Sequence, residues 1–100
     1  TEAISGDIEN SIDEFEIESR IVLYPNPSEG IVNISLYAGN LEYPQFQILD
    51  AQGRIVHQRT EISLEGGENV SFDLTDHQPG MYLMKINTND QILIKRFILK

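Results

Sequence analysis

From Arg20 onward, apolar and polar residues alternate along the chain with a period of two, which is the pattern of half-buried β-strands. In "NVSFDL", Val70, Phe72 and Leu74 lie on one side of the strand, and polar residues lie on the other. The same alternation recurs in "IVNISLY", "QFQILD" and "MYLMKIN". The pattern predicts a core between the apolar faces of several strands. The residues expected to be almost fully buried there are Phe72, Ile34, Ile48, Met84 and Ile86.

Turn-forming sequences separate these apolar runs and recur roughly every 8–12 residues. They are rich in Gly, Pro, Asn and Asp, as in "PNPSEG", "DAQG", "EGGEN" and "TDHQPG". About seven strands are expected, near residues 21–24, 31–37, 44–49, 53–60, 69–74, 81–88 and 91–99. No long helical pattern lies between them, so parallel β-α-β units are excluded. The sequence therefore predicts an all-β fold, an antiparallel β-sandwich of two packed sheets.

Residues 1–19 differ from the rest of the chain in charge and in pattern. Ile4, Ile8, Ile12 and Phe15 follow the spacing of an amphipathic helix. Acidic residues on neighbouring turns would repel one another, however, and Ser, Gly and Asn interrupt the pattern. The two interpretations are a weak acidic helix and a mostly disordered acidic linker, and the second is favoured. We expect a flexible acidic linker over residues 1–19 and a β-domain over residues 20–100.

Composition limits the classes of function that remain. One hundred residues suffice for a single domain, and the opening Thr1 in place of an initiator Met predicts a piece of a longer protein. The net charge is −9, of which residues 1–20 contribute −6, from seven acidic side chains and one basic one. An acidic surface repels phosphate, so nucleic acid is not an expected partner. No apolar run approaches the ~18 residues of a transmembrane segment, and the lack of cysteine excludes disulfides and thiolate chemistry.

The residues that could carry chemistry are few and scattered. His57 and His77 lie far apart without a metal-binding motif, so they are interpreted as surface or turn histidines. Asp73, Asp76 and Asn69 offer oxygen ligands for calcium, but the residue order of a calcium loop is missing, and Asp76 more simply forms an Asx-type turn. Nucleophile-elbow and phosphate-loop motifs are also missing. We expect neither an enzyme nor a cofactor, and calcium near Asp73 and Asp76 is the one metal alternative left open.

Two short motifs have structural explanations. In "YPNPSEG", Pro25 and Pro27 fix their own backbone angles and lack amide donors, and Gly30 can adopt a positive φ, so this stretch is expected to be a turn. Tyr82 stands at the start of a strand, directly after the Pro-Gly turn of "LTDHQPGMY". It is either a tyrosine corner, whose hydroxyl binds upstream backbone as in immunoglobulin-like sandwiches, or simply a core aromatic residue.

Four segments in a fixed order carry a resemblance to a known family. They are "YPNPSEGIVNISL", "FQILDAQGRIVHQ", "LTDHQPGMYLMKI" and "ILIKRFILK", and the resemblance covers about residues 20–100. This set resembles the type IX secretion system C-terminal sorting domain of type A, the Por secretion tail. The resemblance implies an immunoglobulin-like β-sandwich. The residues that match the family's motifs are Pro25, Asn26, Pro27, Asp50, Gly53, Arg54, Gly80 and Tyr82.

The resemblance also implies a function. In that family the domain is a non-catalytic sorting signal that directs a larger cargo protein through the type IX system across the outer membrane. The implied partners are the outer-membrane translocon, its shuttle protein and a sortase-like cysteine protease that removes the domain at the cell surface. Residues 1–19 would then link the domain to the upstream cargo. The implied localisation is export through the periplasm to the cell surface or extracellular space.

The final strand is the expected recognition element. Lys95, Arg96 and Lys100 are half of the six basic residues in residues 21–100, and "ILIKRFILK" is rich in β-branched and aromatic residues. An exposed terminal edge can pair with a partner's sheet; alternatively, these charges only protect an edge strand against aggregation. With the family resemblance, recognition is favoured. The expected sorting residues are Lys95, Arg96, Phe97, Ile98, Leu99 and Lys100.

Two other functions remain as alternatives. A β-sandwich adhesion or carbohydrate-binding module, retained on a secreted enzyme, would need an exposed aromatic platform. The chain has no Trp, and Tyr24, Tyr37 and Tyr43 are the tyrosines available for such a platform. A pure spacer domain would predict that deletion of the domain leaves export unchanged.

Overall fold

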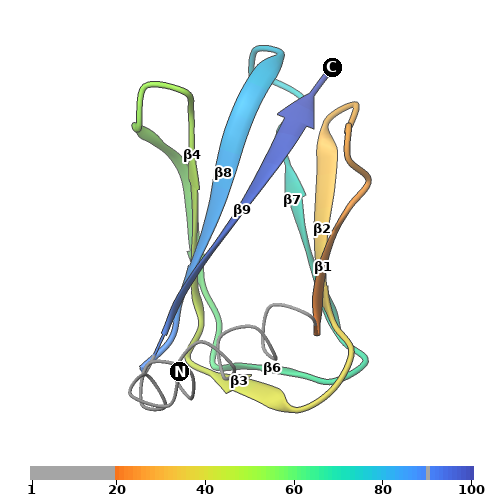
Figure 1. Ribbon diagram of the computed structural model, residues 1–100, viewed down its shortest axis with the longest axis vertical. Helices are drawn as coiled ribbons and strands as arrows, with labels where there is room; N and C mark the ends of the chain where they lie inside the picture. Colours follow the sequence, from red (N-terminus) through yellow and green to blue (C-terminus); the bar gives the residue numbers. More distant parts are fainter. Residues whose placement is uncertain (1–19, 90) are drawn as a thin grey trace, which may run out of the picture.

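A computed structural model of the chain describes residues 20–89 and 91–100 (Figure 1). The predicted linker, residues 1–19, lies outside the described residues and stays a prediction. The described part contains nine β-strands and no helix. The strands are β1 (Ile21–Tyr24), β2 (Ile31–Leu36), β3 (Asn40–Glu42), β4 (Gln45–Leu49), β5 (Ile55–Thr60), β6 (Ser63–Glu65), β7 (Asn69–Asp73), β8 (Gly80–Asn87) and β9 (Ile92–Leu99).

Seven of these strands form two antiparallel sheets that face each other. One sheet has the order β1-β2-β7 and the other has the order β5-β4-β8-β9. Figure 1 shows them as the two walls of a sandwich, with β9 and β1 at neighbouring edges. The predicted all-β, immunoglobulin-like sandwich is confirmed. The seven predicted strands correspond to these seven, and their ends differ from the prediction by at most two residues.

The remaining two strands, β3 and β6, were not predicted. They pair with each other as a two-stranded antiparallel sheet at one end of the sandwich (Figure 1). Leu41 and Leu64 are paired across this ribbon, and both are buried, so the ribbon covers the end of the core. The expected count of seven strands in two sheets is therefore too low. Each missed strand has three residues and one buried side chain, which is too short for an alternating pattern to be recognised.

The predicted core is confirmed. Ile34, Ile48, Met84 and Ile86 have no exposed surface, and Phe72 is 1% exposed. The ring of Phe72 on β7 packs against that of Phe46 on β4, with centroids 5.5 Å apart, so aromatic contact joins the two sheets. Truncating such a residue to Ala typically costs about 2–5 kcal/mol of stability.

The final strand β9 is the edge of the four-stranded sheet and alternates between core and solvent. Leu93, Phe97 and Leu99 are buried, whereas Ile92, Ile94 and Ile98 are exposed on the outer face. Lys95 stands at an inward position of this alternation but is half-exposed, because it lies at the open edge. An inward-facing charge at a sheet edge is a device that opposes uncontrolled strand pairing.

Candidate functional site

The predicted turn after β1 brings the chain back alongside the final strand. The Tyr24–Pro25 and Asn26–Pro27 peptide bonds are both cis, and the residues after them run parallel to β9, with Ser28 opposite Leu99. The backbone N–H of Ser28 donates to the carbonyl of Ile98, and the N–H of Lys100 donates to the carbonyl of Ser28, both at 2.8 Å. We call residues 26–28 the clasp segment.

Asn26 adds a side-chain hydrogen bond to the same edge. Its Oδ1 accepts the backbone N–H of Ile98 at 3.0 Å, and its amide nitrogen lies 3.5 Å from the carbonyl oxygen of Arg96. The side chain of Asn26 therefore pairs with β9 as a neighbouring strand would. The clasp segment closes the free edge at the end of β9, from the carbonyl of Arg96 to Lys100, the residue after the strand.

Ser28 is the polar residue at the centre of this arrangement, and it is completely buried. Its hydroxyl donates to the carbonyl of Ile31 at 2.6 Å and accepts the N–H of Gly30 at 3.0 Å, so both functions of the hydroxyl are satisfied. Gly30 has φ = +143°, and a Cβ added there would lie 2.5 Å from Cγ2 of Thr75. The "NPSEG" stretch is thus a structural turn that fixes the final strand.

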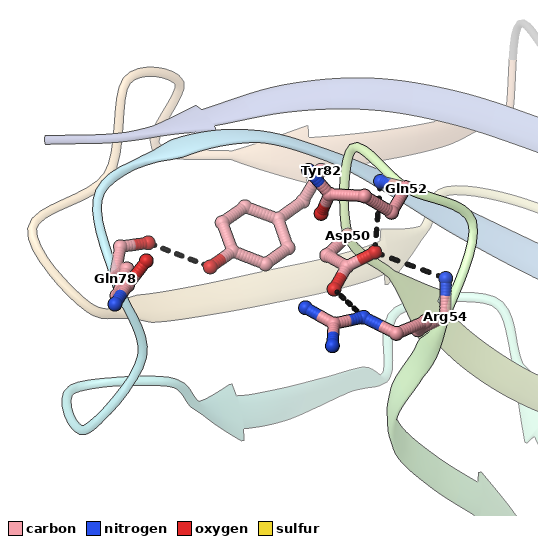
Figure 2. A network of polar contacts seen from close by, with 5 residues as sticks. All are labelled: Asp50, Gln52, Arg54, Gln78 and Tyr82. Carbon is pink, nitrogen blue, oxygen red and sulfur yellow. Dashed lines mark hydrogen bonds and ion pairs between the residues drawn. The ribbon is translucent and has the colours of Figure 1, made fainter.

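A second turn, residues 50–54, is organised by one carboxylate (Figure 2). Oδ1 of Asp50 accepts the backbone N–H groups of Gln52 and Arg54, each at 2.9 Å, and Oδ2 accepts Nε of Arg54 at 2.8 Å. The hydrogen bond from the backbone of Arg54 is the main reason why the pKa of Asp50 lies below its ordinary value. Gly53 has φ = +87°, which a side chain would disfavour. These contacts give the Asp, Gly and Arg of this motif a structural role.

Tyr82 is both a tyrosine corner and a core aromatic residue, the two interpretations that the sequence allowed. Its hydroxyl donates to the carbonyl of Gln78 at 2.6 Å, which is the tyrosine-corner hydrogen bond (Figure 2). Its ring is buried and stacks on Phe97 of β9 with centroids 5.8 Å apart. Gly80, two residues earlier, has φ = +148° and pairs with Leu99. The Gly-x-Tyr motif therefore supports the same final strand.

The turns 50–54 and 76–82 face each other across an open cleft of about 360 Å³. Figure 2 shows Asp50 and Arg54 on one side and Tyr82 with Gln78 on the other. The Asp50 carboxylate, Nε of Arg54 and the Tyr82 hydroxyl are engaged in hydrogen bonds that hold the turns. Among the described residues, no group of three or more His, Cys, Asp or Glu side chains is arranged to hold a metal ion. We see no acid-base pair or nucleophile in this cleft.

Two interpretations of polar residues need correction. The sequence predicts an Asx-type turn at Asp76, but the structure shows it at Asp73, whose Oδ1 accepts the N–H and O–H of Thr75 at 3.0 and 2.7 Å. The Thr75 hydroxyl lowers the pKa of Asp73. His57 is not a plain surface residue, because its ring packs edge-on against Phe72 at 5.5 Å. Its strand, β5, lies at the edge of the four-stranded sheet, and none of its side chains is fully buried.

Comparison with protein families decides what this arrangement belongs to. Residues 22–100 match the model of a family described as the secretion system C-terminal sorting domain, the Por secretion tail of type IX secretion. The chain belongs to this family. A search of curated proteins gives no match. The family is a sorting signal and not a catalytic domain, so this sorting domain serves type IX secretion as a C-terminal signal and interacts with that machinery.

The motif residues of the sorting domain gather at one end of the sandwich. Figure 1 shows the turns at residues 25–30, 50–54 and 75–80 at the same end as Lys100, opposite the β3-β6 ribbon. The described residues include no helix long and apolar enough to cross a membrane. A sorting signal of this family implies secretion to the cell surface or extracellular space as part of a cargo protein.

The structure divides the six residues expected to carry recognition into two groups. Phe97 and Leu99 are core residues, so a partner cannot contact them while the sandwich is folded. Arg96, Ile98 and Lys100 are exposed and Lys95 is half-exposed, so these four are accessible to a partner. Sequence reasoning missed Ser28 altogether, because a buried serine between Pro and Gly has the same local sequence as an exposed turn serine.

Proposed function

We propose that β9 is the element by which the type IX machinery recognises this domain, with Lys95, Arg96 and Lys100 as its basic contacts and Ile98 as an apolar one. The observation that carries the proposal is the position of these residues. They lie on, or directly after, an edge strand that runs to the end where the motif turns meet, and they concentrate positive charge on a domain that is otherwise acidic. Complementary charge speeds the encounter with a partner and favours the right one.

The route and the partners complete the proposal. The domain carries its cargo from the periplasm to the outer-membrane translocon, where the shuttle protein receives it. A sortase-like cysteine protease then removes the domain by cleavage within residues 1–19, which precede the first strand. Mass spectrometry of the secreted cargo should find its new C-terminus upstream of Arg20. A cargo that keeps β1 would contradict this step.

An export assay tests recognition by β9. Deleting residues 97–100 would also remove Phe97 and Leu99, whose burial contributes about 1.5–3 kcal/mol each, so loss of export could reflect misfolding. The cleaner variant replaces Lys95, Arg96 and Lys100 with Gln. Exposed charges contribute only ~0–1 kcal/mol as ion pairs, so this variant should stay folded.

The proposal predicts that the folded Gln variant accumulates in the periplasm. Normal export would mean that the charges only protect an edge strand and that recognition lies elsewhere. The matched control replaces Lys85, a basic residue on β8, with Gln, and it should be exported like the parent. Circular dichroism of each purified variant checks that the fold is intact.

The adhesion alternative receives less support from the positions of its aromatic residues. The carbonyl of Arg20 accepts the N–H of Tyr37, whereas Tyr24 lies at the opposite end of β1, paired with Asn33. Tyr24 and Tyr37 are therefore separated by the length of that strand. A flat carbohydrate-binding platform needs its rings side by side, so Tyr24 and Tyr37 cannot form one together, and the sorting function is the one we propose.

A further inference from the structure

The clasp segment covers only part of the free edge of β9. Ile98 and Lys100 direct their backbone groups away from β8 and toward the clasp segment. Backbone groups alternate in direction along a strand, so Ile92, Ile94 and Arg96 direct theirs to the same free side. Within the described residues, the N–H and C=O groups of Ile92 and Ile94 have no hydrogen-bond partner on that side. An unpaired edge therefore begins where the clasp ends.

The edge of β1 faces this unpaired edge of β9. The carbonyl of Arg20 accepts the N–H of Tyr37, the residue directly after β2, so the same alternation turns the backbone groups of Ile21 and Leu23 away from β2. A groove of about 420 Å³ lies between the two strands, with Ile21 to Leu23 on one side and Ile94 to Arg96 on the other. Its two walls thus both carry backbone donors and acceptors that a further strand could use.

The groove has a charge opposite to that of the molecule. Lys95 and Arg96 are among its lining residues, and no lining residue is acidic, although residues 21–100 contain nine acidic and six basic side chains. On the outer face beside it, Ile92 and Ile94 are 57% and 52% exposed. A strand added next to β9 would cover these two side chains on one face and would meet Lys95 on the other.

We propose that the edge of β9 from Ile92 to the N–H of Arg96, facing β1, docks one extended strand of a partner protein in which acidic and apolar residues alternate. The carboxylates would pair with Lys95 inside the groove, and the apolar side chains would lie over Ile92 and Ile94. A second copy of this chain is disfavoured, because paired β9 edges would bring the Lys95 and Arg96 side chains of the two copies together. This inference rests on the proposed function and specifies the chemistry of the segment that recognises the domain.

A peptide-binding experiment on the chain of residues 1–100 tests the docking edge. The probe is the synthetic peptide Thr-Val-Glu-Val-Glu-Val-Thr, titrated by NMR, with the same peptide carrying Lys for Glu as comparison. We expect the largest amide shifts at Ile92, Ile94 and Leu23, with the amides of Ile98 and Lys100 unchanged. An N-methylated peptide, which lacks the pairing N–H groups, should not bind.

Three variants make the test specific. Lys95→Glu should weaken the Glu peptide about ten-fold and strengthen the Lys peptide correspondingly. Lys85→Glu makes the same charge change on β8 outside the groove and should have little effect. Ile94→Pro places a proline where the N–H faces solvent, which an edge strand tolerates, and should abolish binding while thermal unfolding shows an intact fold.

Each remaining outcome overturns the inference. These outcomes are no binding of the Glu peptide, binding unchanged by Lys95→Glu and Ile94→Pro, self-association through β9, and shifts confined to the outer sheet face or to the clasped amides. Failure of the proposed function is distinguishable from these, because it is measured by export of the Gln variant. Normal export together with peptide binding would refute β9 as the sorting signal and leave the groove as a binding surface.

Discussion

The substitution Ser28→Ala should destabilise the sorting domain far more than its small change in volume suggests. The hydroxyl is fully buried, and its removal leaves the carbonyl of Ile31 without its donor and the N–H of Gly30 without its acceptor. An unsatisfied buried polar group costs about 1–3 kcal/mol, and partial relaxation toward water lowers the combined cost. We expect a loss of about 2 kcal/mol, which is a large share of the ~5–15 kcal/mol of an average domain.

Urea unfolding of the 1–100 chain, followed by circular dichroism, measures this loss as a lower midpoint with an unchanged m-value. For a domain of this size, about 2 kcal/mol corresponds to a decrease in Tm of roughly 8–16 °C. The matched control is Ser35→Ala on β2, where the serine is half-exposed, and it should stay within about 0.5 kcal/mol of the parent.

Hydrogen exchange adds a local readout. The amides of Ile98 and Lys100 donate to the clasp segment, so they should exchange faster in Ser28→Ala than in the parent. The amide of Met84 in the core serves as the reference within each protein. A Ser28→Ala chain as stable as the Ser35→Ala control, with unchanged exchange at Ile98, would refute the reasoning, because the buried hydroxyl would then not hold the clasp.

Three further results follow from single contacts. The pKa of Asp50 is lower in the folded than in the unfolded chain, so protonation favours unfolding; its contribution to stability is complete above pH ~4 and is lost as the pH falls below that. In an acid titration, Asp50→Asn should lose less stability than the parent over that range, and equal slopes would contradict this. Tyr82→Phe keeps the ring but leaves the carbonyl of Gln78 without its donor, so urea unfolding should show a loss of about 0.5–1.5 kcal/mol, whereas no loss would mean that the corner bond is dispensable. Gly30→Ala brings a Cβ to 2.5 Å from Cγ2 of Thr75, so it should lower Tm, and the double variant with Thr75→Ser, which lacks that methyl group, should recover part of the loss; an additive double variant would contradict the clash.

Local patterns in the sequence were sufficient for most of the fold. Period-two alternation in "NVSFDL" placed Val70, Phe72 and Leu74 on the buried face, and turn residues gave the strand limits, because both signals act within a few residues. Strands β3 and β6 escaped because one buried leucine in three residues gives no period. His57 was misjudged because burial of a half-covered edge position depends on the facing sheet, here on Phe72.

The candidate site was only partly predictable. The family motifs identified the turns. The side chain of Asn26, however, accepts a hydrogen bond from Ile98, 72 positions later in the chain, and no local pattern predicts so distant a partner. Basic residues in the final strand could be counted from the sequence, whereas their division into exposed Arg96 and edge-lying Lys95 depends on the register between β8 and β9. The unpaired edge of β9 could not be predicted from the sequence, because its limit is set by the residue at which the clasp segment stops pairing with β9.

The parallel course of the clasp segment and β9 has a mechanical consequence. Force applied along the chain would pull Ser28 toward the N-terminal side and Lys100 in the opposite direction. In this geometry, the three hydrogen bonds that join the clasp segment to Ile98 and Lys100 are loaded together, in shear, and would have to break together. Strands that are peeled apart lose their bonds one at a time. The sandwich is therefore built to resist tension between Ser28 and Lys100, the direction in which force along the chain would act.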